Sequence, residues 1–242
     1  MTLPAVVAPL AAYAALFQTA VYLSLPTRLR LLWAPVVTGG VGALLTVSAG
    51  ILFGFDEVGL VAFDPASTVS WGLAAVVVAS LAGGTMISRP SLRTELADPR
   101  LGSLSRRQMA GQVFVRIPLF TALIEEAFFR GVLHAALAAI YPSQIALWLG
   151  AGLFGLWHIG PGMDQAGAAD KSRVARARHT VATVLATSLA GAFLVWLRIE
   201  TGSIWAPFAV HAGINMTMAT FARLACRWDR HRPSWVGDPK SG

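Results

Sequence analysis

Long runs of apolar residues, separated by short polar segments, dominate this chain. A helix needs about 20 such residues to cross roughly 30 Å of hydrocarbon. Lipid offers the backbone no hydrogen-bond partners, and the sequence lacks the alternating polarity of a membrane β-barrel, so we predict that the runs are helices. The seven predicted spans are residues 4–25, 31–53, 69–88, 112–139, 143–163, 179–199 and 203–222.

Composition supports the same fold class. Of the 242 residues, 55% are hydrophobic and only 13% are charged, and the mean hydropathy is +0.62. These values are typical of an all-α, polytopic integral membrane protein. We expect one transmembrane helical domain over residues 1–226 and a flexible cytoplasmic tail over residues 227–242, which are polar and contain Pro and Gly.

Basic residues alternate between the predicted loops. They follow spans one, three, five and seven, whereas the loops after spans two, four and six are acidic or neutral. Because Lys and Arg favour the cytoplasmic side, this alternation predicts an outer N-terminus and a cytoplasmic C-terminus. The basic residues concerned are Arg28 and Arg30; Arg89, Arg93, Arg100, Arg106 and Arg107; Lys171, Arg173, Arg176 and Arg178; and Arg223, Arg227, Arg230, Arg232 and Lys240.

The net charge of +7 does not indicate a nucleic-acid partner. The bases lie in short loops beside the spans, where topology and anionic lipid explain them, and no nucleic-acid-binding motif accompanies them. Arg greatly outnumbers Lys, which favours a GC-rich bacterial genome. We therefore expect a multi-pass protein of a bacterial plasma membrane.

Three charged residues stand in the middle of the fourth predicted span, in the segment IEEAFFRG. Each charge at the centre of a bilayer costs about 2.5–3.5 kcal/mol on insertion scales, so we expect all three to be paired, hydrated or functional. Glu126 and Arg130 are one helical turn apart and can form a structural ion pair. Glu125 points about 100° away, and we expect it to face a polar cavity as a base.

Other polar groups fall within the later spans. His158 ends span five, and His211 and Asn215 share one face of span seven at i and i+4. A histidine can hydrogen-bond or ligate, and an asparagine can donate to a developing oxyanion. At about 1.5 Å per residue, Glu125, His158 and His211 reach similar depths, so we expect them to meet at a site that opens toward the cytoplasm.

One glutamate and two histidines allow two kinds of hydrolytic chemistry. Glu125, His158 and His211 could hold zinc with an open position, or they could activate water directly. No serine or cysteine stands in a recognisable nucleophile motif.

These residues resemble the motifs of a known family. Glu125-Glu126-x-x-x-Arg130, Phe154-x-x-x-His158 and His211-x-x-x-Asn215 are similar, in this order, to motifs of the CAAX prenyl endopeptidases of the Ras-converting type and their bacterial CPBP relatives, also called abortive-infection proteins. The similarity covers residues 112–222. It does not extend to spans one to three.

The resemblance implies an intramembrane endopeptidase that cleaves a membrane-associated or lipid-modified protein or peptide. Glu125 and His158 would activate the attacking water, while His211 and Asn215 would stabilise the oxyanion or complete a metal site. Glu126 and Arg130 would support the helix and the cavity. Relatives are described both as metalloproteases, for which Glu125, His158 and His211 would bind zinc, and as metal-independent enzymes, so the cofactor stays open.

Two other classes of protein stay open as alternatives. A non-catalytic membrane scaffold or bacteriocin-immunity factor would tolerate the loss of Glu125. A proton-coupled transporter also uses carboxylate and histidine relays, although the sequence shows neither repeated halves nor paired broken helices.

Overall fold

The computed structural model describes residues 9–169 and 172–228, and every regular element in this part of the chain is a helix. The all-helical prediction is therefore confirmed. The tail predicted over residues 227–242 falls outside the described residues from residue 229 onward, so the proposed division into domain and tail stays a prediction. In chain order the helices are η1 (Tyr13–Phe17), α2 (Gln18–Ser24), α3 (Thr27–Phe53), α4 (Pro65–Ser88), α5 (Pro90–Leu96), α6 (Pro99–Gly102), α7 (Arg106–Gly111), η2 (Gln112–Leu123), α8 (Ile124–Glu126), η3 (Ala127–Leu133), α9 (His134–Ala138), α10 (Ser143–Trp157), α11 (Ile159–Ala168), α12 (Arg173–Thr201) and α13 (Trp205–Trp228).

Four helical segments are long and apolar enough to cross a membrane within the described part of the chain. They are Trp33–Leu52, Pro65–Ser88, Ser143–Gly167 and Arg173–Thr201. Each overlaps one of the predicted spans. The described residues of the other three predicted spans are mostly helical as well, but they are not among the four segments that are long and apolar enough to cross a membrane.

The fourth predicted span differs from a lipid-exposed helix in its surroundings. All seven residues of η3 are buried within the protein. A helix enclosed by other helices does not need an apolar surface on every side, and can therefore carry the charged residues of IEEAFFRG.

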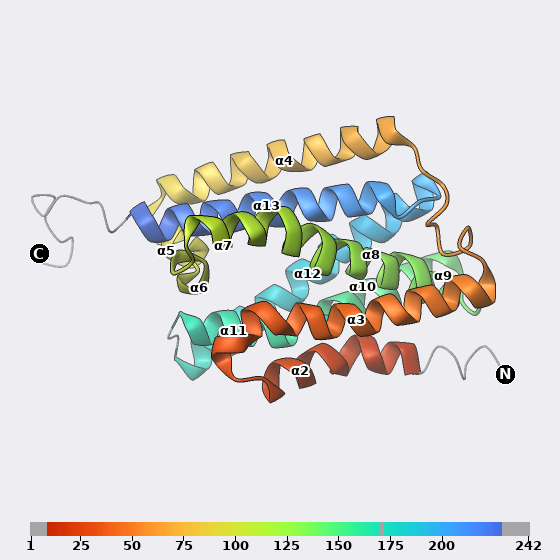
Figure 1. Ribbon diagram of the computed structural model, residues 1–242, viewed down its shortest axis with the longest axis horizontal. Helices are drawn as coiled ribbons and strands as arrows, with labels where there is room; N and C mark the ends of the chain where they lie inside the picture. Colours follow the sequence, from red (N-terminus) through yellow and green to blue (C-terminus); the bar gives the residue numbers. More distant parts are fainter. Residues whose placement is uncertain (1–8, 170–171, 229–242) are drawn as a thin grey trace, which may run out of the picture.

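The helices lie roughly along one long axis, with α4 and α13 side by side and the stretch from α7 to α9 beneath them (Figure 1). Helix α3 runs along the opposite side of the bundle, and α12 crosses behind. Helices α4 and α12 present large apolar side chains outward, including Leu73, Leu81 and Leu189, each more than 60% exposed. Such surfaces suit contact with lipid.

The segments that carry most of the basic residues gather at one end of the bundle. The α2–α3 turn, helices α5 and α6, the start of α12 and the end of α13 all lie there, on the left of Figure 1. The acidic connection between α3 and α4 lies at the other end. This separation agrees with the charge pattern from which the topology was predicted.

Small residues allow two pairs of helices to pack closely. On α10, a Cβ atom at Gly155 would lie 2.7 Å from the carbonyl oxygen of Val184 on α12. On α13, a Cβ at Gly213 would lie 3.3 Å from the carbonyl oxygen of Gly72 on α4. Close backbone approach at small residues is typical of helix packing in membranes. It fixes α13, which carries His211, and α10, whose last residue immediately precedes His158.

Candidate active site

Glu125 and Glu126 lie in α8, a single α-helical turn between the π-helical segments η2 and η3. The helical stretch that contains them starts at a capping box formed by Ser105 and Gln108. π-Helical winding is rare and is often found at functional sites. Both carboxylates are buried, with Glu125 7% and Glu126 0% exposed.

The two oxygens of Glu125 have different surroundings. Oε1 accepts a hydrogen bond from the indole Nε1 of Trp157 at 3.1 Å. Oε2 lies 4.0 Å from Nε2 of His158 and 3.9 Å from Nε2 of His211. The structure thus brings together the glutamate and both histidines that the sequence singled out, although they come from three separate helical segments.

His158 stands at the junction between α10 and α11, with φ −87° and ψ 4°. Its Nδ1 donates to the carbonyl oxygen of Phe154 at 2.7 Å, because a carbonyl can only accept. When the ring is neutral, Nε2 carries the lone pair, and it is Nε2 that faces Glu125. The break in the helix and this hydrogen bond together fix the direction of the imidazole.

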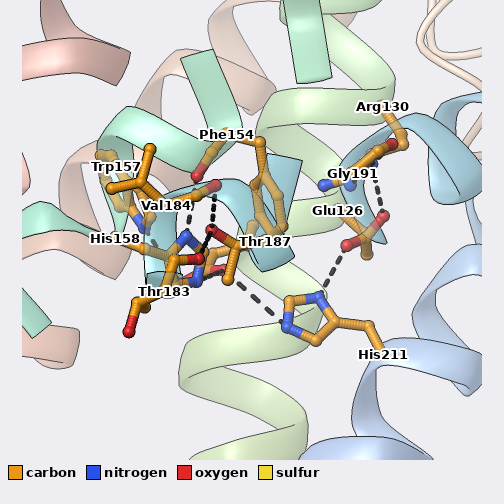
Figure 2. A network of polar contacts seen from close by, with 11 residues as sticks. Glu126, Arg130, Phe154, Trp157, His158, Thr183, Val184, Thr187, Gly191 and His211 are labelled. Atoms are coloured by element: carbon orange, nitrogen blue, oxygen red, sulfur yellow. Dashed lines mark hydrogen bonds and ion pairs between the residues drawn. The ribbon is translucent and has the colours of Figure 1, made fainter. Parts of the chain in front are cut away.

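His211 is held by a buried chain of charged groups. Its Nδ1 donates to Oε1 of Glu126 at 2.7 Å, and Oε2 of Glu126 forms an ion pair with Nε of Arg130 at 3.1 Å. Nη2 of Arg130 donates to the carbonyl oxygen of Gly191 at 3.3 Å. Figure 2 shows these groups between the helices. The ion pair predicted between Glu126 and Arg130 is present, and it also positions His211.

The ring of Phe154 packs against three of these groups. It makes edge contacts with His158 and His211, with ring centroids 4.7 and 5.8 Å apart. The guanidinium of Arg130 lies over its face, 4.1 Å from the centroid. Such a cation–π contact is favourable where solvent is excluded. Phe154 therefore separates the Glu126–Arg130 pair from solvent and supports both imidazoles.

A cavity of about 280 Å³ reaches this site. Glu125, His158 and Asn215 are among its lining residues. Arg100 of α6 and Asp98, which immediately precedes α6, also line it. Asn215 and Glu125 thus line the same cavity. The cavity extends toward the end of the bundle where the basic segments gather, as expected for a site open on that side.

Oε2 of Glu125 is not directly hydrogen-bonded to Nε2 of either histidine. An ionised carboxylate only accepts hydrogen bonds, and Nε2 of a neutral imidazole whose Nδ1 is protonated also accepts. Separations of 3.9 and 4.0 Å are too long for direct hydrogen bonds but match two groups that share one water at about 2.8 Å from each. The arrangement is therefore suited to holding and deprotonating a water molecule.

The same donors fit zinc less well. Zinc ligands lie about 2.0–2.2 Å from the metal in a tetrahedron, which places ligand atoms about 3.4 Å apart rather than 3.9–4.0 Å. Within the described residues, no group of three or more His, Cys, Asp or Glu side chains is arranged to hold a metal ion. Oε2 of Glu125 and the two imidazoles are therefore better placed to share a water molecule than to hold zinc.

Two of the groups that position the site were not predicted from the sequence. Trp157 holds Glu125, and the backbone carbonyl of Gly191 receives Arg130. Trp157 immediately precedes His158 in the segment FGLWH, and this position next to a predicted site residue could have identified it. A backbone carbonyl has no such signal in the sequence.

Comparison with known proteins provides independent evidence. Residues 108–217 match the family described as type II CAAX prenyl endopeptidase Rce1-like. No curated protein and no solved structure matches the chain. The matched segment contains all the predicted site residues: Glu125, Glu126, Arg130, His158, His211 and Asn215. The resemblance predicted from the sequence is therefore confirmed over this segment, which is similar to the Rce1-like family of type II CAAX prenyl endopeptidases.

Proposed function

We propose that this protein is an intramembrane endopeptidase in which Glu125 activates water for attack on a peptide bond. The observation that carries the proposal is the position of Oε2 of Glu125 about 4 Å from Nε2 of both His158 and His211. The family match supports the reaction class.

The reaction begins with water held between Oε2 of Glu125 and Nε2 of His158. Glu125 takes one proton as the oxygen attacks the carbonyl carbon of the substrate. The carbonyl oxygen becomes an oxyanion beside Asn215 and His211, and the side-chain amide of Asn215 donates a hydrogen bond to it. The C–N bond then breaks, and the proton on Glu125 passes to the leaving amine. Water is thereby divided between a new carboxyl group and a new amino group.

The remaining charged groups serve this step indirectly. The Glu126 carboxylate accepts from Nδ1 of His211, which directs Nε2 of His211 toward Glu125. Arg130 balances the charge of Glu126. Glu126 and Arg130 are both positioning residues, because neither touches the reacting atoms.

The substrate is a membrane-associated or lipid-modified protein or peptide, since the site lies inside a bundle with lipid-facing helices. We further propose seven spans with the N-terminus outside and the C-terminus inside a bacterial plasma membrane. The basic segments gathered at one end of the bundle support this orientation.

The proposal is tested by a quantitative mass-spectrometric survey of new peptide termini in membranes that contain wild type or Glu125→Gln at matched levels. Gln keeps the size and the Oε1 acceptor of Glu125 but cannot take a proton. Termini found only with wild type would establish proteolysis and identify the substrate. If no termini depend on Glu125 across several growth conditions, the protein acts as a non-catalytic scaffold, an immunity factor or a transporter.

A further inference from the structure

Helix α6 lies at the inner end of the bundle, where the basic segments gather, between α13 and α11 (Figure 1). Asp98, Arg100 and Leu101 line the cavity that contains Glu125. Leu101 is buried, and it packs in one apolar cluster with Ala225 of α13. One side of α6 is therefore anchored to α13 through apolar contacts.

On its other side, α6 is held by ion pairs. Nη1 of Arg100 pairs with Oδ2 of Asp164 on α11, and Oδ1 of Asp164 pairs with Nη1 of Arg30 on α3 at 3.1 Å. Arg100 also pairs with Asp98 through Nη2 and Nε, at 2.7 and 3.0 Å. Arg100 thus connects α6 to α11 at the inner end of the cavity, and Asp164 extends the connection to α3.

Water reaches these ion pairs, unlike the enclosed pair of Glu126 and Arg130. The side chains of Arg30 and Arg100 are 23% and 21% exposed, and ion pairs in contact with water are weaker than enclosed ones. Burial lowers the pKa of Arg100, but the hydrogen bond and charge of the neighbouring aspartates outweigh burial and raise the pKa above its ordinary value. Arg100 therefore stays charged at physiological pH, and its connection to α11 is not a pH switch.

The outer end of the bundle is joined in a different way. The backbone N–H of Ile204 donates to the carbonyl oxygen of Gly59 at 3.1 Å, and Nε1 of Trp205 donates to the carbonyl oxygen of Leu60 at 3.0 Å. These bonds fix the main chain of the α3–α4 connection against the start of α13. An ion pair between two side chains separates by rotation about side-chain bonds alone. We therefore expect the outer end to stay closed and the α6 end to be the one that opens.

The cavity is small for a peptide. Its volume of about 280 Å³ is just below the roughly 300–1,000 Å³ of pockets that bind small molecules. A peptide bond placed at Glu125 is flanked by further residues on both sides. The cavity therefore has to widen before a substrate can bind.

We propose that residues 98–102 form a strap across the inner end of the cavity, and that the ion pair between Arg100 and Asp164 is the latch that keeps the strap closed until a substrate enters. The inference rests on the proposed function, because the peptide substrate is what passes the strap. When the latch opens, the strap stays attached to α13 through Leu101 and moves away from α11.

Opening leaves neither charge of the latch without a partner. Arg100 keeps its contacts with Asp98, which moves with it as part of the strap. Asp164 keeps Arg30, which belongs to α3 and does not move with the strap. A buried charge left unpaired would be costly, and this arrangement avoids that cost in both states.

The inference is tested by the rate at which a cysteine inside the cavity reacts with a membrane-impermeant maleimide, with the protein in nanodiscs. Thr121 lines the cavity four positions before Glu125. The parent protein is Thr121→Cys/Cys226→Ser, in which the chain's one native cysteine is removed. Adding Arg100→Gln removes the cation of the latch. Because a hydrogen bond between charged groups shifts an equilibrium by about 10- to 100-fold, we expect the labelling rate to rise by about that factor.

Two further variants of the parent complete the test. Asp164→Asn keeps the size of the side chain but removes its charge, and it should also raise the labelling rate. Arg106→Gln is the matched control, because Arg106 is exposed, lies on α7 and is not among the residues that line the cavity. Its labelling rate should equal that of the parent. Thermal unfolding shows which variants remain folded.

Movement of the strap itself is measured with spin labels on Ser103→Cys and Met163→Cys in the Cys226→Ser background. Ser103 follows α6 directly and Met163 belongs to α11, and both are exposed. We expect one distance between the labels when the latch is intact. Arg100→Gln should add a population with a longer distance.

Three results would overturn the inference. Equal labelling rates in the parent, Arg100→Gln and Asp164→Asn would show that the strap does not limit access to the cavity, and an unchanged label distance in Arg100→Gln would show that it does not move. Unfolding of both latch variants would show that the ion pair is a fixed structural brace. None of these measurements requires cleavage. If the wild type produces no termini that depend on Glu125, the proposed function fails, and the labelling rates still decide whether the strap closes the cavity.

Discussion

Trp157 donates its indole hydrogen to Oε1 of Glu125 at 3.1 Å, so that Oε2 is the oxygen directed toward the two histidines. Trp157 is itself fixed, 3% exposed, with its ring against Tyr13 and Phe129 at centroid distances of 5.4 and 5.5 Å. A carboxylate would otherwise rotate between equivalent positions. This single hydrogen bond therefore sets the orientation of the proposed base.

Replacing Trp157 with Phe tests that role. The substitution keeps an aromatic ring in the cluster but removes the N–H donor. Because a hydrogen bond to a charged group contributes about 1.5–3 kcal/mol, we expect kcat to fall by about 10- to 100-fold while the protein still folds. The measurement is the rate of cleavage of the substrate found in the termini survey.

Trp148→Phe is the matched control for this variant. Trp148 lies on the same helix, α10, but is 62% exposed on its outer surface. Its substitution should leave kcat unchanged. A Trp157→Phe enzyme as active as the Trp148→Phe enzyme would show that the indole does not position Glu125.

The distances at the site also predict the response to chelators. Because Oε2 of Glu125 lies 3.9–4.0 Å from Nε2 of each histidine and tetrahedral zinc requires about 3.4 Å between ligand atoms, we expect cleavage to persist after dialysis against 1,10-phenanthroline. Elemental analysis of the dialysed protein should find no stoichiometric zinc. Loss of activity that one equivalent of Zn²⁺ restores would contradict the metal-free mechanism.

The Glu126–Arg130 ion pair is fully buried, with both side chains 0% exposed. Removal of one partner of such a pair leaves an unbalanced buried charge, which typically costs about 3–5 kcal/mol. We therefore expect Glu126→Gln to lower the thermal unfolding temperature markedly. The double variant Glu126→Gln/Arg130→Met should be less destabilised than the sum of the single variants.

Glu200→Gln controls for the loss of a carboxylate as such, because Glu200 is exposed near the end of α12. It should unfold at the wild-type temperature. Additive effects of Glu126→Gln and Arg130→Met would show that the two side chains do not act as a pair.

The contact between α10 and α12 gives a prediction about stability alone. A Cβ at Gly155 would meet the carbonyl oxygen of Val184 at 2.7 Å and Cβ of Ser188 at 3.2 Å, whereas a Cβ at Gly152 meets nothing within 4 Å. Gly155→Ala should therefore destabilise the protein. Gly152→Ala should be neutral or slightly stabilising, since Ala favours a helix by up to about 1 kcal/mol. Thermal unfolding of the two variants side by side decides the matter, and equal unfolding temperatures would contradict the close packing.

Much of the site follows from local rules in the sequence. Helical spacing predicted the Glu126–Arg130 pair, and the high cost of charge in a membrane pointed to Glu125. Depth along the helices predicted that His158 and His211 would approach it, and they do, within 4.0 Å. Each of these predictions depends only on the spacing of residues along one helix or on their depth in the membrane.

The remaining features depend on how the helices pack. Regular α-helical periodicity does not predict the π-helical winding of η2 and η3, and this winding changes which side chains face the cavity. The hydrogen bond from Trp157 depends on the rotation of α10 about its axis, which tertiary contacts determine. The second role of Glu126, as the partner of His211, requires α13 to lie beside α8, and local sequence carries no sign of this.

The membrane topology illustrates the same limit. Hydropathy identified the segments that correspond to α3, α4, α10–α11 and α12, where the lipid-facing surface must be apolar. It is less informative for residues 112–139, because other helices enclose much of that stretch. The seven-span topology with an outer N-terminus stays a prediction, and labelling of single cysteines placed in the loops would test it.

The most direct test of the central claim is a single-turnover cleavage in H₂¹⁸O with purified protein in nanodiscs. Direct attack by water activated at Glu125 predicts one ¹⁸O atom in the new carboxyl group of every product molecule. It also predicts a rate at least about 100-fold lower for Glu125→Gln, as expected for loss of a general base. Cleavage by Glu125→Gln at the wild-type rate, or a first-turnover product without ¹⁸O, would contradict the account.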